Sequence, residues 1–171
     1  MSLPSPSMSR RLAVPVLVAS LAGFTGLGIG LQTMSAQADD QSAAGRHRVL
    51  SSADAPATIG PYSQGIGVGP QVFLSGQLPL DPVTNQIPPG ATIRDQTRQV
   101  LENLSAVLAS DAMTLADVVS TTVYLADIND FAAFNEVYAE YFTDKPPARA
   151  TVQVAQIPRG AKVEISAIAI R

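Results

Sequence analysis

The fold class follows from one stretch, VVSTTVYLADINDFAAFNEVYAEYFTDKPPARATVQVAQ, residues 118–156 of a chain of 171 residues. Residues 118–125 are rich in β-branched side chains and alternate in polarity, which predicts a strand, and residues 149–156 predict another. Aromatic side chains between them recur at three- and four-residue steps, which predicts a helix over 130–142 with Asn129 as its N-cap. A strand, a helix and a strand in succession imply a right-handed crossover between parallel strands.

Upstream of this unit, the sequence predicts a further strand and a further helix. Residues 72–78 alternate as a half-buried strand does, with Gly76 on the same side as Val72, and the prolines after them cannot continue a strand ladder. A helix is expected from the N-cap Thr92 to about residue 110, with Asp95 in the capping-box position. Its apolar stripe comprises Ile93, Val100, Leu101, Leu104, Val107 and Leu108.

The last predicted strand, residues 162–170, follows a turn at Pro158-Arg159-Gly160. One of its faces is apolar, whereas the other combines Glu164 with Ile168 and Ile170. Two helices can cover only one face of a five- or six-stranded sheet, so the other face meets water or another subunit. The mixed face therefore predicts an α+β protein that associates through its sheet, with a polar site in the interface.

Composition excludes several kinds of chemistry. The chain has 11 Lys and Arg against 14 Asp and Glu, so it lacks the basic excess that a nucleic-acid partner requires. It has no cysteine and one histidine, His47, which is expected to be a solvated residue without a role at the start of an edge strand. We therefore expect no metal ion and no cofactor, and chemistry that uses carboxylates, arginine, tyrosine, serine and the backbone.

The first forty residues differ from the rest of the chain. The pair Arg10-Arg11 precedes an uncharged run over residues 12–31 and the small-residue site Ala36-Gln37-Ala38, which is typical of a cleaved secretory signal peptide. An uncleaved membrane anchor is the alternative, because ~20 apolar residues span a bilayer, and the arginine pair is compatible with twin-arginine export. The expected organisation is a signal peptide at 1–38, a flexible linker at 39–47 and a domain at 48–171, located in the periplasm or secreted.

Three segments could carry chemistry. Gly60-Pro61-Tyr62-Ser63-Gln64 forms a turn that leads into a strand. Ser75-Gly76-Gln77 places a hydroxyl beside a glycine within a strand, where a ligand can approach closely or a bulge can form. Pro147-Ala148-Arg149 begins a strand, and Glu164 lies on the final one. A turn, a bulge and a structural ion pair between Arg149 and Glu164 would account for the same residues.

These segments, together with Asp127-Ile128-Asn129-Asp130-Phe131 and Val163-Glu164-Ile165, resemble the Rid family of enamine/imine deaminases, also labelled endoribonuclease L-PSP. The resemblance runs collinearly over about residues 48–171. It implies a chorismate-mutase-like mixed β-sheet with two helices on one face, and a homotrimer with clefts between subunits. For members that carry the arginine, it implies hydrolysis of 2-imino acids to 2-oxo acids and ammonia without a cofactor.

The resemblance also implies roles for single residues. Arg149 would hold the substrate carboxylate, because its planar fork matches a carboxylate in a way that lysine does not. Glu164 would position or activate water, since an iminium carbon is already electrophilic and needs only orientation, a water and a proton carrier. Thr151 stands where several relatives carry cysteine. The substrate-binding residues would be Tyr62, Ser75, Gly76, Arg149 and Thr151.

Alternatives stay open at this level. A non-catalytic module could capture small carboxylates in the same cleft, although such a binder gains nothing from Glu164. Ribonuclease activity fits an acidic chain poorly, because RNA cleavage favours a basic groove. If the last two strands form a tight hairpin, Arg149 and Glu164 lie ~20 Å apart along them, and one site would need the two residues from neighbouring chains.

Overall fold

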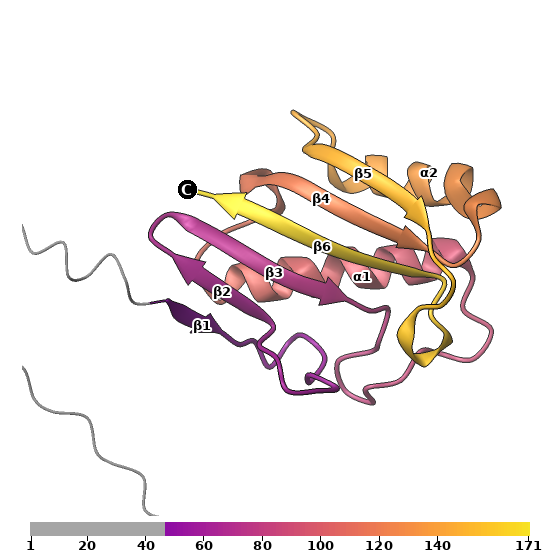
Figure 1. Cartoon of the computed structure of the whole chain (residues 1–171), viewed down its shortest axis with the longest axis horizontal. Helices are drawn as coiled ribbons and strands as arrows, with labels where there is room; N and C mark the ends of the chain where they lie inside the picture. Colours follow the sequence, from indigo (N-terminus) through magenta and orange to yellow (C-terminus); the bar gives the residue numbers. More distant parts are fainter. Residues whose placement is uncertain (1–46) are drawn as a thin grey trace, which may run out of the picture. The chain divides into compact units, whose positions relative to one another are not determined.

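The computed structural model describes residues 47–171, so the predicted signal peptide and nearly all of the predicted linker lie outside the described residues. The described part forms a sheet of six strands with two α-helices (Figure 1). The strands are β1 (Arg48–Leu50), β2 (Gly65–Val68), β3 (Gln71–Gln77), β4 (Val118–Leu125), β5 (Ala148–Gln153) and β6 (Val163–Ile170). The helices are α1 (Ile93–Ala109) and α2 (Phe131–Tyr141), with short 3-10 turns η2 (Leu115–Asp117), η3 (Ile128–Asp130) and η4 (Pro158–Gly160). Within residues 47–171, no helix has the length and apolar character that crossing a membrane demands.

The sheet order is β1-β2-β3-β6-β4-β5. Strands β4 and β5 are parallel, as the strand–helix–strand pattern predicts, and the other neighbours are antiparallel. The considered hairpin between the last two strands is wrong, because β6 lies between β3 and β4 and does not pair with β5. The crossover through α2 places β5 on one edge of β4, and β6 pairs with the other edge of β4, which leaves β5 as an edge strand of the sheet.

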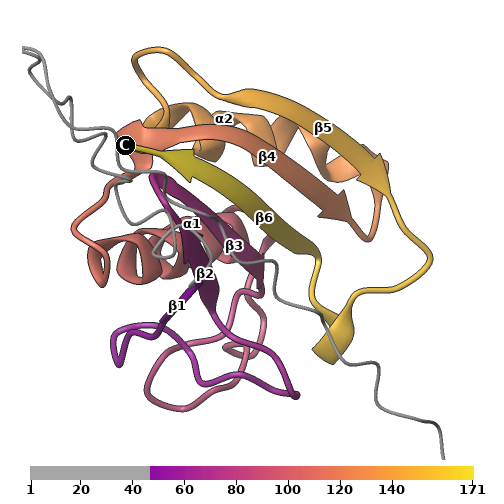
Figure 2. The same ribbon diagram turned by 60° about the vertical axis from the view of Figure 1, so that its left-hand side comes forward.

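Both helices pack on the same face of the sheet (Figures 1 and 2). Helix α1 begins as predicted, since the Thr92 hydroxyl accepts a hydrogen bond from the Asp95 amide at 3.3 Å. The Asp95 carboxylate in turn accepts one from the Thr92 amide at 2.9 Å. This capping box satisfies backbone donors that the first helical turn leaves free. Every residue of the predicted apolar stripe is buried.

The predicted N-cap of the second helix is wrong. The 3-10 turn η3 precedes α2, and its N-cap is Asp127, whose carboxylate accepts hydrogen bonds from the amide and the side chain of Asn129, both at 2.9 Å. The aspartate supplies the acceptor two residues earlier, so the side chain of Asn129 serves as a donor. The helical periodicity itself is confirmed, because Phe134 and Tyr138 of α2 lie in the core.

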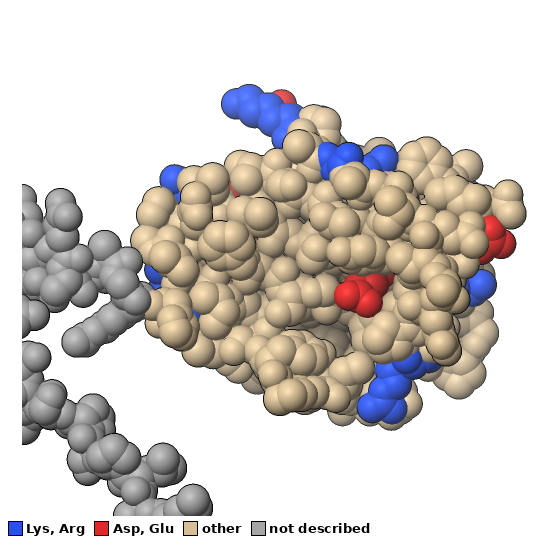
Figure 3. Space-filling view, in the orientation of Figure 1, with Lys and Arg blue, Asp and Glu red and all other residues tan. Residues whose placement is uncertain are grey.

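Within residues 47–171, no α-helix covers the opposite face of the sheet, which is the face turned toward the viewer in Figure 1. On β6, Glu164 and Ile168 point to this open face, while their neighbours Val163 and Ile165 are fully buried on the helix side. Phe73 lies beside Ile168 in the register and is 43% exposed. In the space-filling view, this face is almost free of charge except for an acidic group beside a hollow (Figure 3). The centre of the open face is thus largely uncharged, with exposed apolar side chains such as Phe73 and Ile168 and one carboxylate within it.

Candidate functional site

The hollow on the open face, called here the Glu164 pocket, has a volume of about 350 Å³. It contains Tyr62, Ser75, Gly76 and Glu164, which the resemblance to the Rid family assigns to the cleft. Its lining residues are Ile59, Tyr62, Ser75, Gly76, Leu78, Pro158 and Glu164. One pocket is therefore formed by β6, by β3 and by the turn before β2. Its walls are mainly apolar, and it contains the carboxylate of Glu164.

A β-bulge in β3 shapes this pocket. The register with β6 shifts between Leu74 and Gln77, so the predicted alternation that placed Gly76 with Val72 on the buried face is wrong. A Cβ atom at Gly76 would overlap the carboxylate of Glu164. Any larger residue here would have to displace the Glu164 carboxylate from its observed position. The bulge considered for the Ser-Gly-Gln segment is therefore confirmed, whereas the group that approaches Gly76 closely is a side chain of the same chain and not a ligand.

Glu164 is half-buried, and burial raises the pKa of its carboxyl group above the ordinary value. No arginine or lysine of residues 47–171 forms an ion pair with it. A carboxyl group with a raised pKa accepts and releases protons nearer to neutral pH than a solvated one. The surroundings of Glu164 thus suit a proton carrier better than a structural ion-pair partner.

Ser75 and Tyr62 hold the turn over the pocket. The Ser75 hydroxyl donates to the carbonyl of Ser63 at 2.6 Å, and the Ser75 amide donates to the carbonyl of Gln64 at 3.0 Å. The Tyr62 hydroxyl accepts from the amide of Ile59 at 3.3 Å. Because the single donor of Ser75 is already used, its oxygen can only accept a further hydrogen bond. Ser75 therefore positions the wall of the pocket and remains available as an acceptor.

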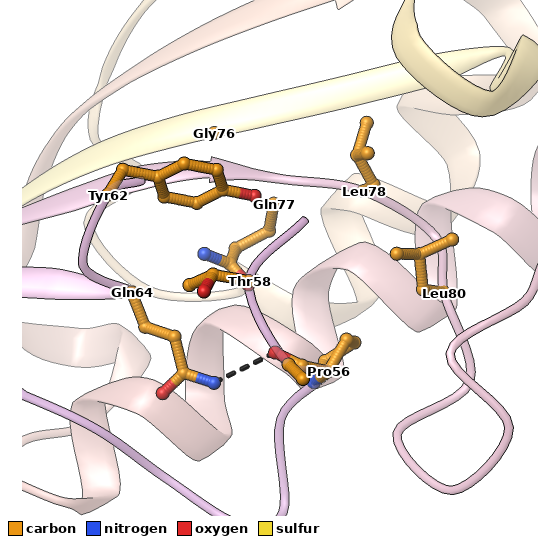
Figure 4. A pocket seen from close by; sticks show the side chains of 9 residues that line it. Pro56, Thr58, Tyr62, Gln64, Gly76, Gln77, Leu78 and Leu80 are labelled. Carbon is orange, nitrogen blue, oxygen red and sulfur yellow. Dashed lines mark hydrogen bonds between the residues drawn. The ribbon is translucent and has the colours of Figure 1, made fainter. Parts of the chain in front are cut away.

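Gln64 has a structural role that the sequence did not reveal. Its side chain is 6% exposed, and its oxygen accepts from the amide of Ser52 at 2.6 Å. Its nitrogen donates to the carbonyl of Pro56 at 2.9 Å (Figure 4). Figure 4 shows the space that this clamp leaves beneath Tyr62, a cavity of about 20 Å³, enough for one water molecule. The clamp fixes the segment on which the Tyr62 ring rests.

A second hollow, called here the Arg149 pocket, lies beside α2 and has a volume of about 470 Å³. The Arg149 guanidinium donates to the Asn135 side-chain oxygen at 2.8 Å and lies over the Tyr138 ring, 4.5 Å from its centroid. The hydroxyl of Thr151, two residues further along β5, is buried without a hydrogen-bond partner. A buried hydroxyl without a partner is uncommon, but Thr151 is not among the residues that line the Arg149 pocket. Asn135 was missed because its place on α2 gave no sign that it faces Arg149.

The sheet separates the two pockets within one chain. Arg149 is the register partner of Thr121, whose hydroxyl is hydrogen-bonded to Tyr138 of α2, so Arg149 belongs to the helix face. Glu164 belongs to the open face. An ion pair between these two residues of one chain is therefore wrong. The hairpin considered for them is also wrong. Within one chain, the two residues line different pockets.

Comparison with known proteins places the chain in a family. Residues 52–171 match the family model Endoribonuclease L-PSP. A RutC family protein of Pyrococcus horikoshii is 51% identical over 123 residues, which cover 72% of this chain and 97% of that protein. The 2-iminobutanoate/2-iminopropanoate deaminase of Capra hircus is 47% identical over 124 residues, covering 72% of this chain and 90% of that protein.

Solved structures agree with the fold. TdcF of E. coli, crystallised with bound serine, superposes with a TM-score of 0.69 at 42% identity, covering 72% of this chain and 98% of TdcF. A Rid family protein of Yersinia pestis gives a TM-score of 0.71 at 41% identity, covering 74% of this chain and 100% of that one. These values confirm the α+β fold with two helices on one face of a mixed sheet. The matched region includes all the residues of both pockets. On the family model and the identities, the chain belongs to the Rid family, whose model is described as Endoribonuclease L-PSP.

Proposed function

We propose that this protein is an exported trimeric hydrolase that converts 2-imino acids to 2-oxo acids and ammonia. One observation carries the proposal. In the part of the chain that the structure describes, the guanidinium of Arg149 has uncharged partners and the carboxyl group of Glu164 has no ion pair, and the two lie on opposite faces of the sheet. The Arg149 pocket of one chain and the Glu164 pocket of a neighbour would together form a complete cleft, with a cation for the substrate carboxylate and a proton carrier for water.

In this cleft, Arg149 would bind the carboxylate through its free N–H groups, and the Thr151 hydroxyl would donate a further hydrogen bond. The walls beside Glu164 are mainly apolar, so covering this pocket with a neighbouring chain would exclude bulk water and strengthen both interactions. The iminium carbon would then face the neighbouring chain's carboxyl group. Positioning of this kind is the main requirement, because the carbon is already electrophilic.

Hydrolysis needs one water and one proton carrier. The water oxygen bonds to the iminium carbon while Glu164 takes a proton from it, and Glu164 then returns this proton to the nitrogen. The C–N bond breaks as the new hydroxyl loses its proton to Glu164, and ammonia finally takes that proton and leaves as ammonium. The positive charge of the iminium ends on ammonium, so atoms and charge balance without an oxidant or a reductant.

The relatives support this activity, since proteins named 2-iminobutanoate/2-iminopropanoate deaminase are 47% identical to this chain. Trimer formation is supported by the apolar open face, which carries no helix. Export is supported by the Arg10-Arg11 pair, the apolar run and the Ala36-Gln37-Ala38 site. Intact mass of the protein from the cell envelope tests export, because cleavage leaves a chain that begins at Asp39 and an anchor keeps the apolar run.

The activity is tested with 2-imino acids generated in place by an amino-acid oxidase, with 2-oxo acid and ammonia release followed in the presence of the purified protein. Arg149→Lys keeps the charge but not the fork, and we expect the rate to fall roughly 30- to several-thousand-fold, the effect of ~2–5 kcal/mol. Arg98→Lys, on the outer surface of α1, is the matched control and keeps the wild-type rate.

Two results would contradict the proposal. A wild-type protein that binds 2-oxobutanoate yet does not accelerate imino-acid hydrolysis would be a carboxylate-binding module. An Arg149→Lys variant that keeps its activity but melts at a lower temperature would give the arginine a structural role. Circular dichroism and light scattering on each variant separate a loss of chemistry from a loss of fold or assembly.

A further inference from the structure

The Arg149 guanidinium lies against an aromatic surface of α2. Its central carbon is 4.5 Å from the ring centroid of Tyr138, 5.4 Å from that of Phe134 and 5.7 Å from that of Phe131. A guanidinium within about 6 Å of a ring centroid is attracted by the negative face of the ring. Tyr138 is the nearest of the three and therefore makes the largest contribution.

Tyr138 is itself held rigidly. Its side chain lies in the core, and the residue is 6% exposed. Its hydroxyl is hydrogen-bonded to the Thr121 hydroxyl at 2.8 Å, and its ring packs against Phe142 with centroids 4.5 Å apart. Burial raises the pKa of this phenol, and the hydroxyl of Thr121 and the nearby guanidinium of Arg149 oppose that rise, so the hydroxyl also lies near the arginine. Thr121 is the register partner of Arg149 on β4. The strand pair that carries the arginine thus also anchors the ring beneath it.

The remaining geometry of the guanidinium is set by Asn135, one helical turn before Tyr138, which accepts a hydrogen bond from one nitrogen. The ring occupies one face of the guanidinium and Asn135 one of its N–H groups, so other N–H groups remain for a ligand. A free arginine side chain loses substantial rotamer entropy when it is ordered by a ligand. An arginine that is ordered beforehand avoids that cost.

We infer that Tyr138 is a positioning residue, whose ring, more than its hydroxyl, holds the Arg149 fork ready for a carboxylate. The inference rests on the carboxylate-binding role of Arg149 in the proposed function. It assigns to the aromatic stripe of α2 a second task besides core packing. Removing the ring should weaken carboxylate binding, whereas removing only the hydroxyl should not.

The test measures the affinity of the full-length protein for 2-oxobutanoate, an unreactive carboxylate, by NMR titration. For Tyr138→Leu, we expect the dissociation constant to rise about 3- to 30-fold, because a desolvated cation–π contact is lost. Tyr138→Phe keeps the ring and stays within about twofold of wild type, although loss of the pair with Thr121 lowers its melting temperature. Tyr141→Leu makes the same change three residues further along α2, where the hydroxyl contacts Glu102 and not Arg149, and it leaves the affinity unchanged.

A second measurement requires no ligand and no buried substitution. In wild type, the ring current of Tyr138 shifts the Arg149 Nε–H signal upfield, and the signal is identified by its absence in Arg149→Lys. An unshifted signal, or equal weakening of binding by Tyr138→Leu and Tyr141→Leu, overturns the inference. A wild-type protein that binds 2-oxobutanoate through Arg149 but hydrolyses no imino acid refutes the proposed reaction and leaves this inference standing, whereas absence of binding refutes both.

Discussion

Glu164, the proton carrier of the proposed reaction, lowers the stability of the folded chain when it is charged. The folded chain raises the pKa of its carboxyl group through burial, so the folded state binds this proton more tightly than the unfolded state does. The contribution of Glu164 to the free energy of unfolding therefore decreases as pH rises through the range between its ordinary pKa and its raised one. Above that range, the folded state holds a charged carboxylate that no cation of residues 47–171 compensates.

Glu164→Gln should consequently stabilise the protein while it removes the proton carrier. We expect the variant to melt at a higher temperature than wild type at pH 7, and the difference to vanish once the pH falls below about 4, where glutamic acid is protonated in both states. Differential scanning calorimetry between pH 4 and 8 measures this. Carboxyl groups with lowered pKa values, such as Asp111, make the free energy of unfolding increase with pH. Because both proteins contain these groups, their effect cancels in the difference between variant and wild type. A variant that is less stable than wild type at pH 7 would contradict the prediction.

Among the elements, α1 is the one whose beginning the sequence predicts most completely. The hydroxyl of Thr92 and the carboxylate of Asp95 satisfy each other's backbone amides. The element lies on the helix side of the sheet, away from the Glu164 pocket on the open face. A change at this cap should therefore alter stability without altering chemistry.

Thr92→Ala tests this separation. We expect the free energy of unfolding in urea to fall by about 1 kcal/mol, the usual value of an N-cap side chain, with imino-acid hydrolysis unchanged at 25 °C. Thr143→Ala, at an exposed threonine just after α2, is the matched control and should leave the free energy of unfolding almost unchanged. A large loss of activity in Thr92→Ala would mean that the start of α1 is coupled to the cleft.

The neighbouring elements show where sequence reasoning reaches its limit. The strand–helix–strand unit predicts the parallel pairing of β4 with β5 correctly, because the crossover needs only local patterns. The place of β6 between β3 and β4 depends instead on which strand edges are free after the crossover has formed. The bulge in β3 also involves residues far apart in the sequence, because the carboxylate that lies against Gly76 belongs to Glu164 of β6.

For the whole molecule, the separation of Arg149 and Glu164 by the sheet leads to a complementation experiment. Arg149→Ala and Glu164→Ala chains are each expected to be inactive. If the two residues of a cleft come from different chains, random mixing in equal amounts leaves about one quarter of the clefts intact. Subunits exchanged by mild denaturation and refolding should then recover roughly that fraction of the wild-type rate.

The controls are each variant carried through the same exchange alone, and mixed trimers verified by native mass spectrometry. Recovery near one quarter supports the cleft between subunits. Verified mixed trimers without recovered activity would mean that both residues act from one chain. Light scattering of the wild type at micromolar concentration provides the accompanying check, since a monomer mass would remove the basis of the shared cleft.

The amino-acid sequence was enough to predict the helices, most strands, the capping box and, through the resemblance to the Rid family, the segments that line the two pockets. These features depend on propensities, hydrogen bonds and periodicities that act over a few residues. Long-range contacts, in contrast, set the strand order, the clamp formed by Gln64 and the contact of Arg149 with Asn135. They also place Arg149 and Glu164 on opposite faces, because strand pairing and register choose the face of each side chain, and both depend on residues far apart in the chain.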